Sequence, residues 1–306
     1  MQNNKKSQSP KFLPRIIANN NEHDFRRSPQ VHILREELHT ALLPYGGRSN
    51  SYSNFHTELS GNDIDKAKCL LNSITGSDAT EVNQIICEVI NTLGNVLSYS
   101  GVVRYEIVES DGYFLSHIPE ESFYDLKYLF VQVVPKEQQK NGNKKFIFNR
   151  AKYVWTLTLP ENVCHWKSYR KILKGLAQNT NTTPPCVDNA DLIQNSIGFN
   201  FESYNRETTK YIYKIINCIG GNQRDSRTGF ATEFYIVNRE LKFNLSKILI
   251  REHIIDELNS LFIRLNLDSQ IVISGLPTSL CIKELISDIG SGKVGLNKAL
   301  STINIY

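Results

Sequence analysis

A long stretch without helix-breaking residues constrains this chain most, because residues 231–274 contain neither glycine nor proline. Apolar side chains recur there every three or four residues, which is the spacing of one helix face. They are Phe234, Val237, Leu241, Leu245 and Ile248, followed by Ile255, Leu258, Phe262 and Leu265. The pattern predicts one helix of about 35 residues, about 50 Å long. A compact domain of ordinary size does not require such a helix, so its length needs a structural reason.

Composition is that of a soluble globular protein, since 40% of the 306 residues are hydrophobic and 22% are charged. The net charge of +4 does not by itself indicate nucleic-acid binding. The six Cys residues are far apart and include no C-x-x-C pair, so we expect reduced thiols and no zinc site. No apolar run approaches a bilayer span, and no signal-peptide core is present, so we expect neither membrane embedding nor export.

The remaining segments predict an α+β fold in which flanking helices accompany a small antiparallel sheet and the one long helix. Residues 1–29 are polar and aperiodic, which is typical of a disordered arm, and residues 44–61 read as a loop. Residues 211–216 fit a strand and a helix start equally well. We expect helices over 64–74, 81–97, 166–177 and 279–289, and strands over 101–108, 128–134, 145–148, 154–159 and 270–273.

Three helix starts have candidate capping residues with short polar side chains. Asp63 precedes the helix predicted over 64–74, and Asp78 or Ser77 precedes the next one. Asp225, Ser226 or Thr228 would cap the long helix.

No catalytic constellation is evident, so we expect no enzymatic activity, no cofactor and no metal site. The segment 290–293 (GSGK) lacks the upstream glycine of a phosphate loop, and Val294 stands where Ser or Thr would hold magnesium. Cys164 and His165 are neighbours on an extended segment and point to opposite faces, so they cannot form a nucleophile–base pair. The loop ahead of the long helix is more informative, because a rigid helix can present its charges to a partner. A solvated loop that caps the helix explains the same residues.

Four segments, taken in chain order, resemble the portal proteins of tailed bacteriophages. The helix at 81–97 and the strand 101–108 (GVVRYEIV) are similar to the family's helix followed by a G-x-a-y-x-E-i strand. Residues 157–166 (LTLPENVCHW) resemble its i-P-x-x-v-x-H segment, and residues 233–259 resemble the long helix after its tunnel loop. Residues 291–299 (SGKVGLNKA) resemble its terminal G-x-i-t-x-N-E-a pattern, with Lys298 in place of Glu.

Portal proteins assemble as rings at one capsid vertex, pass double-stranded DNA through a central channel, and dock the packaging motor and later the tail. The resemblance therefore implies a non-enzymatic homo-oligomer that contacts double-stranded DNA, capsid, motor and tail proteins, and no membrane. It implies a location in the virion or the cytoplasm of a bacterial host. Asn222, Gln223, Arg224, Asp225 and Arg227 would lie in a tunnel loop, and Glu233, Phe234, Tyr235, Arg239, Leu258 and Asn259 on the long helix that radiates from the channel.

The resemblance also implies a division of the chain into parts with portal-like wing and stem roles. These parts are an N-terminal arm (1–29), an α+β wing-like domain (30–165), a shortened stem and clip (166–218), a tunnel loop (219–229) and the long helix with a C-terminal wing or crown part (230–306).

Only 67 residues separate His165 from Glu233, the interval in which portal proteins place two stem helices and a clip. Two interpretations stay open: two short stem helices with a minimal clip, or a degenerate relative that forms no full ring. Two other function classes also stay open. One is a nucleic-acid- or partner-binding protein of a mobile element that uses the basic arm and the cluster at 167–174. The other is an enzyme of unrecognised type, which would need a deep pocket with converging ionisable groups.

Overall fold

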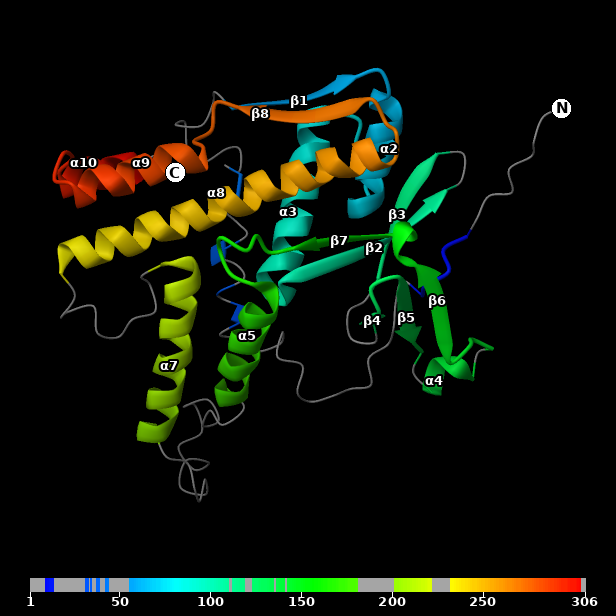
Figure 1. Ribbon diagram of the computed structural model, residues 1–306, viewed down its shortest axis with the longest axis horizontal. Helices are drawn as coiled ribbons and strands as arrows, with labels where there is room; N and C mark the ends of the chain where they lie inside the picture. Colours follow the sequence, from blue (N-terminus) through cyan, green and yellow to red (C-terminus); the bar gives the residue numbers. More distant parts are fainter. Residues whose placement is uncertain are drawn as a thin grey trace.

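The structure is a computed structural model of the chain, and the long helix α8 dominates it (Figure 1). Our description covers residues 9–13, 31, 32, 34, 37, 38, 42, 43, 55–109, 112–118, 123–134, 136–140, 142–180, 201–221 and 232–303. Within this part of the chain, no helix is both long and apolar enough to cross a membrane.

Helix α8 (Glu233–Arg264) has 32 residues and confirms the predicted long helix. Thr232 is its N-cap, and the Thr232 hydroxyl accepts a hydrogen bond from the Tyr235 backbone N–H at 3.2 Å. The predicted caps at 225, 226 and 228 are therefore wrong, because the helix begins after them. The apolar stripe is buried along most of its length, except that Phe234 is 47% exposed.

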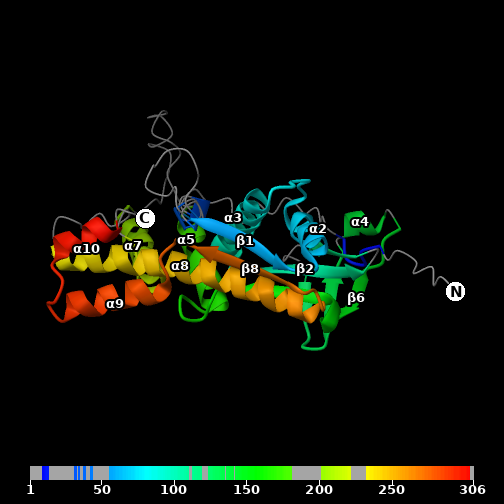
Figure 2. The same cartoon turned by 90° about the horizontal axis from the view of Figure 1, so that it is seen from above.

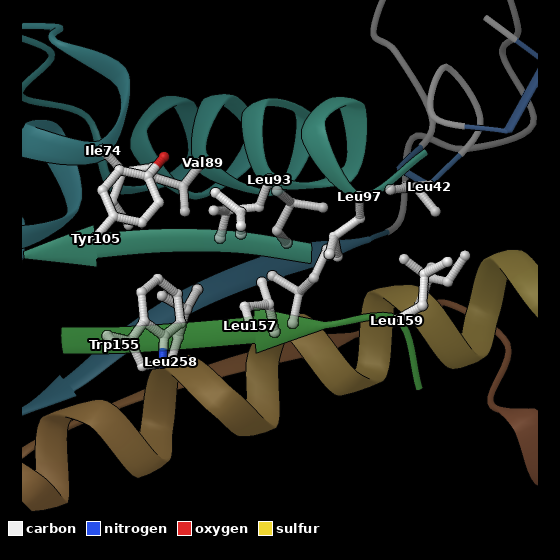
Figure 3. Close-up of a cluster of buried hydrophobic side chains, with 14 of the residues drawn as sticks. Leu42, Ile74, Val89, Leu93, Leu97, Tyr105, Trp155, Leu157, Leu159 and Leu258 are labelled. Atoms are coloured by element: carbon white, nitrogen blue, oxygen red, sulfur yellow. The ribbon is translucent and has the colours of Figure 1, made fainter. Parts of the chain in front are cut away.

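The main core lies around a three-stranded antiparallel sheet of order β3-β2-β7. Its strands are β2 (Val102–Glu109), β3 (Tyr113–His117) and β7 (Val154–Thr158). The central strand β2 is buried at every residue except its last, so both of its faces are covered. Helix α2 (Ile64–Thr75) packs on β3, and helix α3 (Val82–Ser100) packs on β2 and α8. Figure 3 shows the leucines of α3 above the sheet and α8 below it.

A separate two-stranded sheet pairs β1 (His56–Gly61) with β8 (Ser269–Ser274) in antiparallel register. The loop predicted over 44–61 is therefore wrong for residues 56–61, where Thr57 and Leu59 are buried. Asp63 is the predicted N-cap residue of α2, although its side chain makes no capping hydrogen bond. Its carboxylate instead accepts the backbone N–H of Asp268, next to β8. The prediction of Asp78 or Ser77 is wrong, because the N-cap of α3 is Glu81.

A third antiparallel sheet, of order β4-β5-β6, lies at one end of the molecule. It contains β4 (Phe123–Asp125), β5 (Leu129–Val133) and β6 (Phe146–Arg150), with the short helix α4 (Lys136–Gln139) between β5 and β6 and the turn η4 (Ala151–Tyr153) after them. The single sheet expected for the middle of the chain is thus split in two, because β2 pairs with β3 and β7, whereas β5 pairs with β4 and β6.

Residues 9–13 lie against this third sheet, so the prediction of a disordered arm is wrong for them. Phe12 is 2% exposed and packs with Ile118, Phe130 and Val154. The Phe12 backbone N–H donates to the Glu106 carboxylate at 2.8 Å.

At the opposite end, α9 (Ser279–Gly290) and α10 (Leu296–Ile303) pack on the first half of α8 (Figures 1 and 2). One core cluster joins side chains from Val31 to Ile271. The wing-like part (30–165) and the C-terminal part (230–306) that were predicted as separate units therefore both contribute side chains to this main core.

Candidate nucleic-acid interface

Two helices, α5 (Trp166–Thr180) and α7 (Phe201–Ile219), form an antiparallel pair on one side of α8 (Figure 1). At one end, the Sγ atoms of Cys164 and Cys218 are 3.2 Å apart. Further along, a Cβ built on Gly175 would overlap the ring of Tyr211, so the backbone of α5 approaches α7 closely there. At 1.5 Å per residue, α5 is about 22 Å long and α7 about 28 Å. The ambiguous segment at 211–216 is therefore helix.

Helix α5 is amphipathic and carries a basic stripe. Its buried side chains recur at helical spacing and are Tyr169, Ile172, Leu173, Leu176 and Ala177. The Tyr169 hydroxyl donates to the Ser98 carbonyl oxygen at 2.5 Å and fixes the helix to α3. Lys167, Lys171 and Lys174 are exposed on the other side. Because α5 contains no Asp or Glu, its positive charge is not neutralised within the helix.

Helix α7 presents a second row of cations, at a four-residue spacing. Arg206, Lys210 and Lys214 are all exposed. Lys210 forms an ion pair with Glu207 at 3.1 Å, and the Lys214 ammonium lies 4.9 Å from the Tyr211 ring centroid. The cluster on α5 was predicted from the sequence, whereas this row was not, although its cations recur at the i, i+4, i+8 spacing of one helix face.

Two glycines connect α7 to the segment that leads to α8. Gly220 and Gly221 have φ angles of 83° and 91°, which favour glycine. A Cβ on Gly220 would lie 2.4 Å from a backbone nitrogen of α8, at Phe243. The Gly221 N–H donates to the Arg239 carbonyl oxygen at 3.0 Å, and Arg239 Nε donates back to the Gly221 carbonyl oxygen at 2.9 Å. Arg239 therefore fixes the entry to residues 222–231.

The five tunnel-loop candidates (Asn222, Gln223, Arg224, Asp225 and Arg227) lie outside the described residues. The structure describes the residues at either side of this loop, Gly221 and Thr232. The six long-helix candidates fall into two groups. Glu233, Phe234 and Tyr235 are exposed at the start of α8, whereas Arg239 and Leu258 are buried and Asn259 is half-buried.

Asn259 has a structural role that was not predicted from the sequence. Its side-chain Nδ2 donates to the Ile271 carbonyl oxygen at 3.0 Å, and its Oδ1 accepts the Ile271 N–H at 2.8 Å. The amide thus pairs with both backbone groups of one β8 residue, which fixes β8 against α8.

A cavity of about 200 Å³ lies between α7, α8 and the side chains of Leu34 and Glu37. Its walls are mainly aliphatic, and its ionisable groups are Glu37, Glu240 and Lys247. Burial raises the pKa of Glu240 and lowers the pKa of Lys247, while the nearby opposite charges act against both shifts. The positive charge of Lys247 near the two carboxylates offsets part of the desolvation cost of burying these three groups.

The two thiols of the cysteine pair beside these helices have pKa values shifted in opposite directions. The hydrogen bond from the Cys164 thiol, together with the charge of Lys242, lowers the pKa of Cys218 to about 7. The same bond and burial raise the pKa of Cys164. Among the described residues, no three His, Cys, Asp or Glu side chains gather as metal ligands would.

Comparison with known proteins gives no relative for this arrangement. No protein family matches the chain, and neither does any curated protein or solved structure.

Proposed function

We propose that this protein is a portal-like ring subunit that contacts double-stranded DNA and has no catalytic role. The observation that carries the proposal is the antiparallel α5–α7 pair, which lies in chain order between strand β7 and the long helix α8. Portal proteins place their two stem helices at this point in the sequence. The pair supports the interpretation in which short stem helices flank a minimal clip.

The length of α8 supports the same proposal. A helix of 32 residues extends for about 48 Å, and its two halves pack on different partners. The first half contacts α9 and α10, and the second half contacts the main core. A ring subunit needs such an element to connect its inner and outer parts, whereas a single compact domain does not.

The exposed lysines of α5 suit a channel through which DNA must move. Lys167, Lys171 and Lys174 recur about every 4.5 to 6 Å along the helix, so they can meet a regular row of phosphates. Contacts between exposed ammonium groups and phosphates do not read sequence, and they weaken as salt increases. Such contacts hold a duplex without fixing its position.

Mass measurement of the purified protein tests the ring. Mass photometry at micromolar concentration should show a closed high-mass species, because head-to-tail contacts that close produce a ring of defined size. A protein that remains strictly monomeric under these conditions would rule out the portal-like assembly.

A charge-reversal pair tests the DNA contact. A plot of the logarithm of the duplex binding constant against the logarithm of the salt concentration has a negative slope. In Lys167→Glu/Lys171→Glu, the magnitude of this slope should fall by about 0.9 for each phosphate that the protein no longer neutralises. Lys283→Glu/Lys293→Glu is the matched control, because it makes the same charge change at exposed residues of the α9–α10 region. Equal weakening of duplex binding in the two variants would show that net charge, and not the α5–α7 pair, determines DNA binding.

A second function has one observation in its favour. The positive charge of α5, a helix without acidic residues, can bind nucleic acid without any ring, as in a DNA-binding protein of a mobile element. Duplex binding by a monomer that is abolished in Lys167→Glu/Lys171→Glu would favour this second function.

A further inference from the structure

The sheet β4-β5-β6 has one buried and one exposed face. On the buried face, Gln132 and Phe130 contact residues 12 and 13. The strand register puts Tyr124, Val131 and Phe148 in one row on the other face, because Tyr124 pairs with Val131 and Val131 pairs with Phe148. We call this second side the outer face.

The outer face is rich in exposed aromatic rings. Tyr124 is 60% exposed, Phe148 53% and Phe146 41%. Phe146 and Phe148 are two residues apart on β6, and their ring centroids are 6.3 Å apart. Val131, the central member of the row, is only 8% exposed. Three ring systems therefore lie on an ordered sheet with much of their surface in contact with solvent, which is unusual for a monomeric surface.

Positive charge surrounds these rings. Residues 123–153 contain seven Lys or Arg and two Asp or Glu, so their net charge is +5, against +4 for the whole chain. All seven cations are exposed. Three lie next to aromatic rings. The Lys145 ammonium is 5.2 Å from the Phe146 ring centroid, that of Lys127 is 5.2 Å from the ring of Tyr128, and that of Lys152 is 4.7 Å from the ring of Tyr153. Arg150 lies on the outer face itself, two residues beyond Phe148.

We propose that the outer face binds single-stranded nucleic acid, with bases stacked on Tyr124, Phe146 and Phe148 and phosphates paired with the surrounding cations. Aromatic rings on a sheet provide stacking surfaces for any unpaired base, and basic groups track the backbone. In a duplex the bases are already stacked, so these rings would find no partner there. A contact between protein subunits is less favoured, because lysine is depleted in the buried cores of such interfaces.

This inference does not depend on the ring proposal. The outer face lies at the end of the molecule away from α9 and α10, and β4, β5 and β6 make no major contact with α5 or α7 among the described elements (Figure 1). A single-stranded segment held here would be separate from a duplex held by the α5–α7 pair.

Fluorescence anisotropy with an oligothymidine of about 12 nucleotides tests the proposal, since small sheet platforms cover about 4–16 nucleotides. The variant Tyr124→Ala/Phe148→Ala should bind at least about 25-fold more weakly, because each stacked base contributes roughly five-fold or more. Both side chains are more than half exposed, so the fold should persist, and circular dichroism checks this. The matched control is Ile263→Ala/Leu280→Ala, which removes two exposed apolar side chains elsewhere and should bind as the unmodified protein does.

Three further results decide the question. Phe148→Trp should retain binding, because a larger ring still stacks. Unchanged oligothymidine binding in Tyr124→Ala/Phe148→Ala would overturn the proposal. A change in oligomer mass in that variant, with oligothymidine binding intact, would also overturn it and would assign the outer face to contacts between copies of this chain.

Discussion

Placing a carboxylate on the buried stripe of α8 should unfold much of the protein. Leu258 is 1% exposed and belongs to the main core, in the cluster that also contains Trp155 and Leu157 (Figure 3). In Leu258→Asp, removal of the leucine side chain from the core costs about 2–5 kcal/mol. The aspartate must also be protonated or exposed, and protonating it at pH 7 costs about 4 kcal/mol more. The sum, about 6–9 kcal/mol, is comparable to the whole stability of a typical domain.

Urea unfolding followed by circular dichroism measures this cost, and three comparisons isolate its cause. Leu258→Ala should lose only the part that comes from packing. Ile263→Asp, at a position 75% exposed on the same helix, should change the free energy of unfolding by about 0.5 kcal/mol or less. The defect of Leu258→Asp should shrink as pH falls towards about 4, because protonation is then no longer costly. If Leu258→Asp is as stable as Ile263→Asp at pH 7, the assignment of the buried stripe is wrong.

Gly220→Ala should reduce the free energy of unfolding by about 2–4 kcal/mol, because residue 220 has a positive φ and the new Cβ meets the backbone of α8. Gly76 also has a positive φ but open space around it, so Gly76→Ala should reduce the free energy of unfolding by only about 1 kcal/mol in the same urea titration. Alkylation of Cys218 by iodoacetamide should accelerate as pH rises through about 7, where its thiolate forms. Cys164→Ala should move the midpoint of this pH dependence upward, because it removes the thiol hydrogen bond that lowers the pKa of Cys218. An unmoved midpoint would exclude that hydrogen bond as the cause of the lowered pKa. Burial raises the pKa of Glu106 above its ordinary 4.5, so the folded state holds a proton that the unfolded state has released. Stability should therefore fall as pH rises from 4.5 through the raised pKa, and Glu106→Gln should remove this dependence from urea midpoints measured across that range.

The helices were the most predictable part of the fold, because the apolar side chains of one helix face recur at a fixed spacing within a single segment. The period in residues 233–264 required no knowledge of distant residues, and α8 matched it apart from Phe234. That side chain follows the spacing but extends beyond the core, so it is exposed. Periodicity identifies which side of a helix is apolar, whereas tertiary packing decides how far along the helix that side is covered.

Sheet pairing was much less predictable, since it depends on residues far apart in sequence. Most strands were expected, but their distribution over three sheets was not, and β1 was hidden in a segment that read as a loop. The same limit affected the sites. The basic residues of α5 follow one another in the sequence and were found. The outer face needs Tyr124 and Phe148 to meet across Val131, and no local pattern predicts that register.

The pairing of β1 with β8 has a consequence for how the chain is made. His56 pairs with Ser274, so β1 leaves the ribosome long before its partner is synthesised. At about 5–20 residues per second, this delay lasts roughly 10–40 s. During that time the edge of β1 that pairs with β8 lacks its partner strand, and an unpaired strand edge is a template for pairing with other chains. Nascent chains of this protein should therefore need a chaperone more than its modest size suggests.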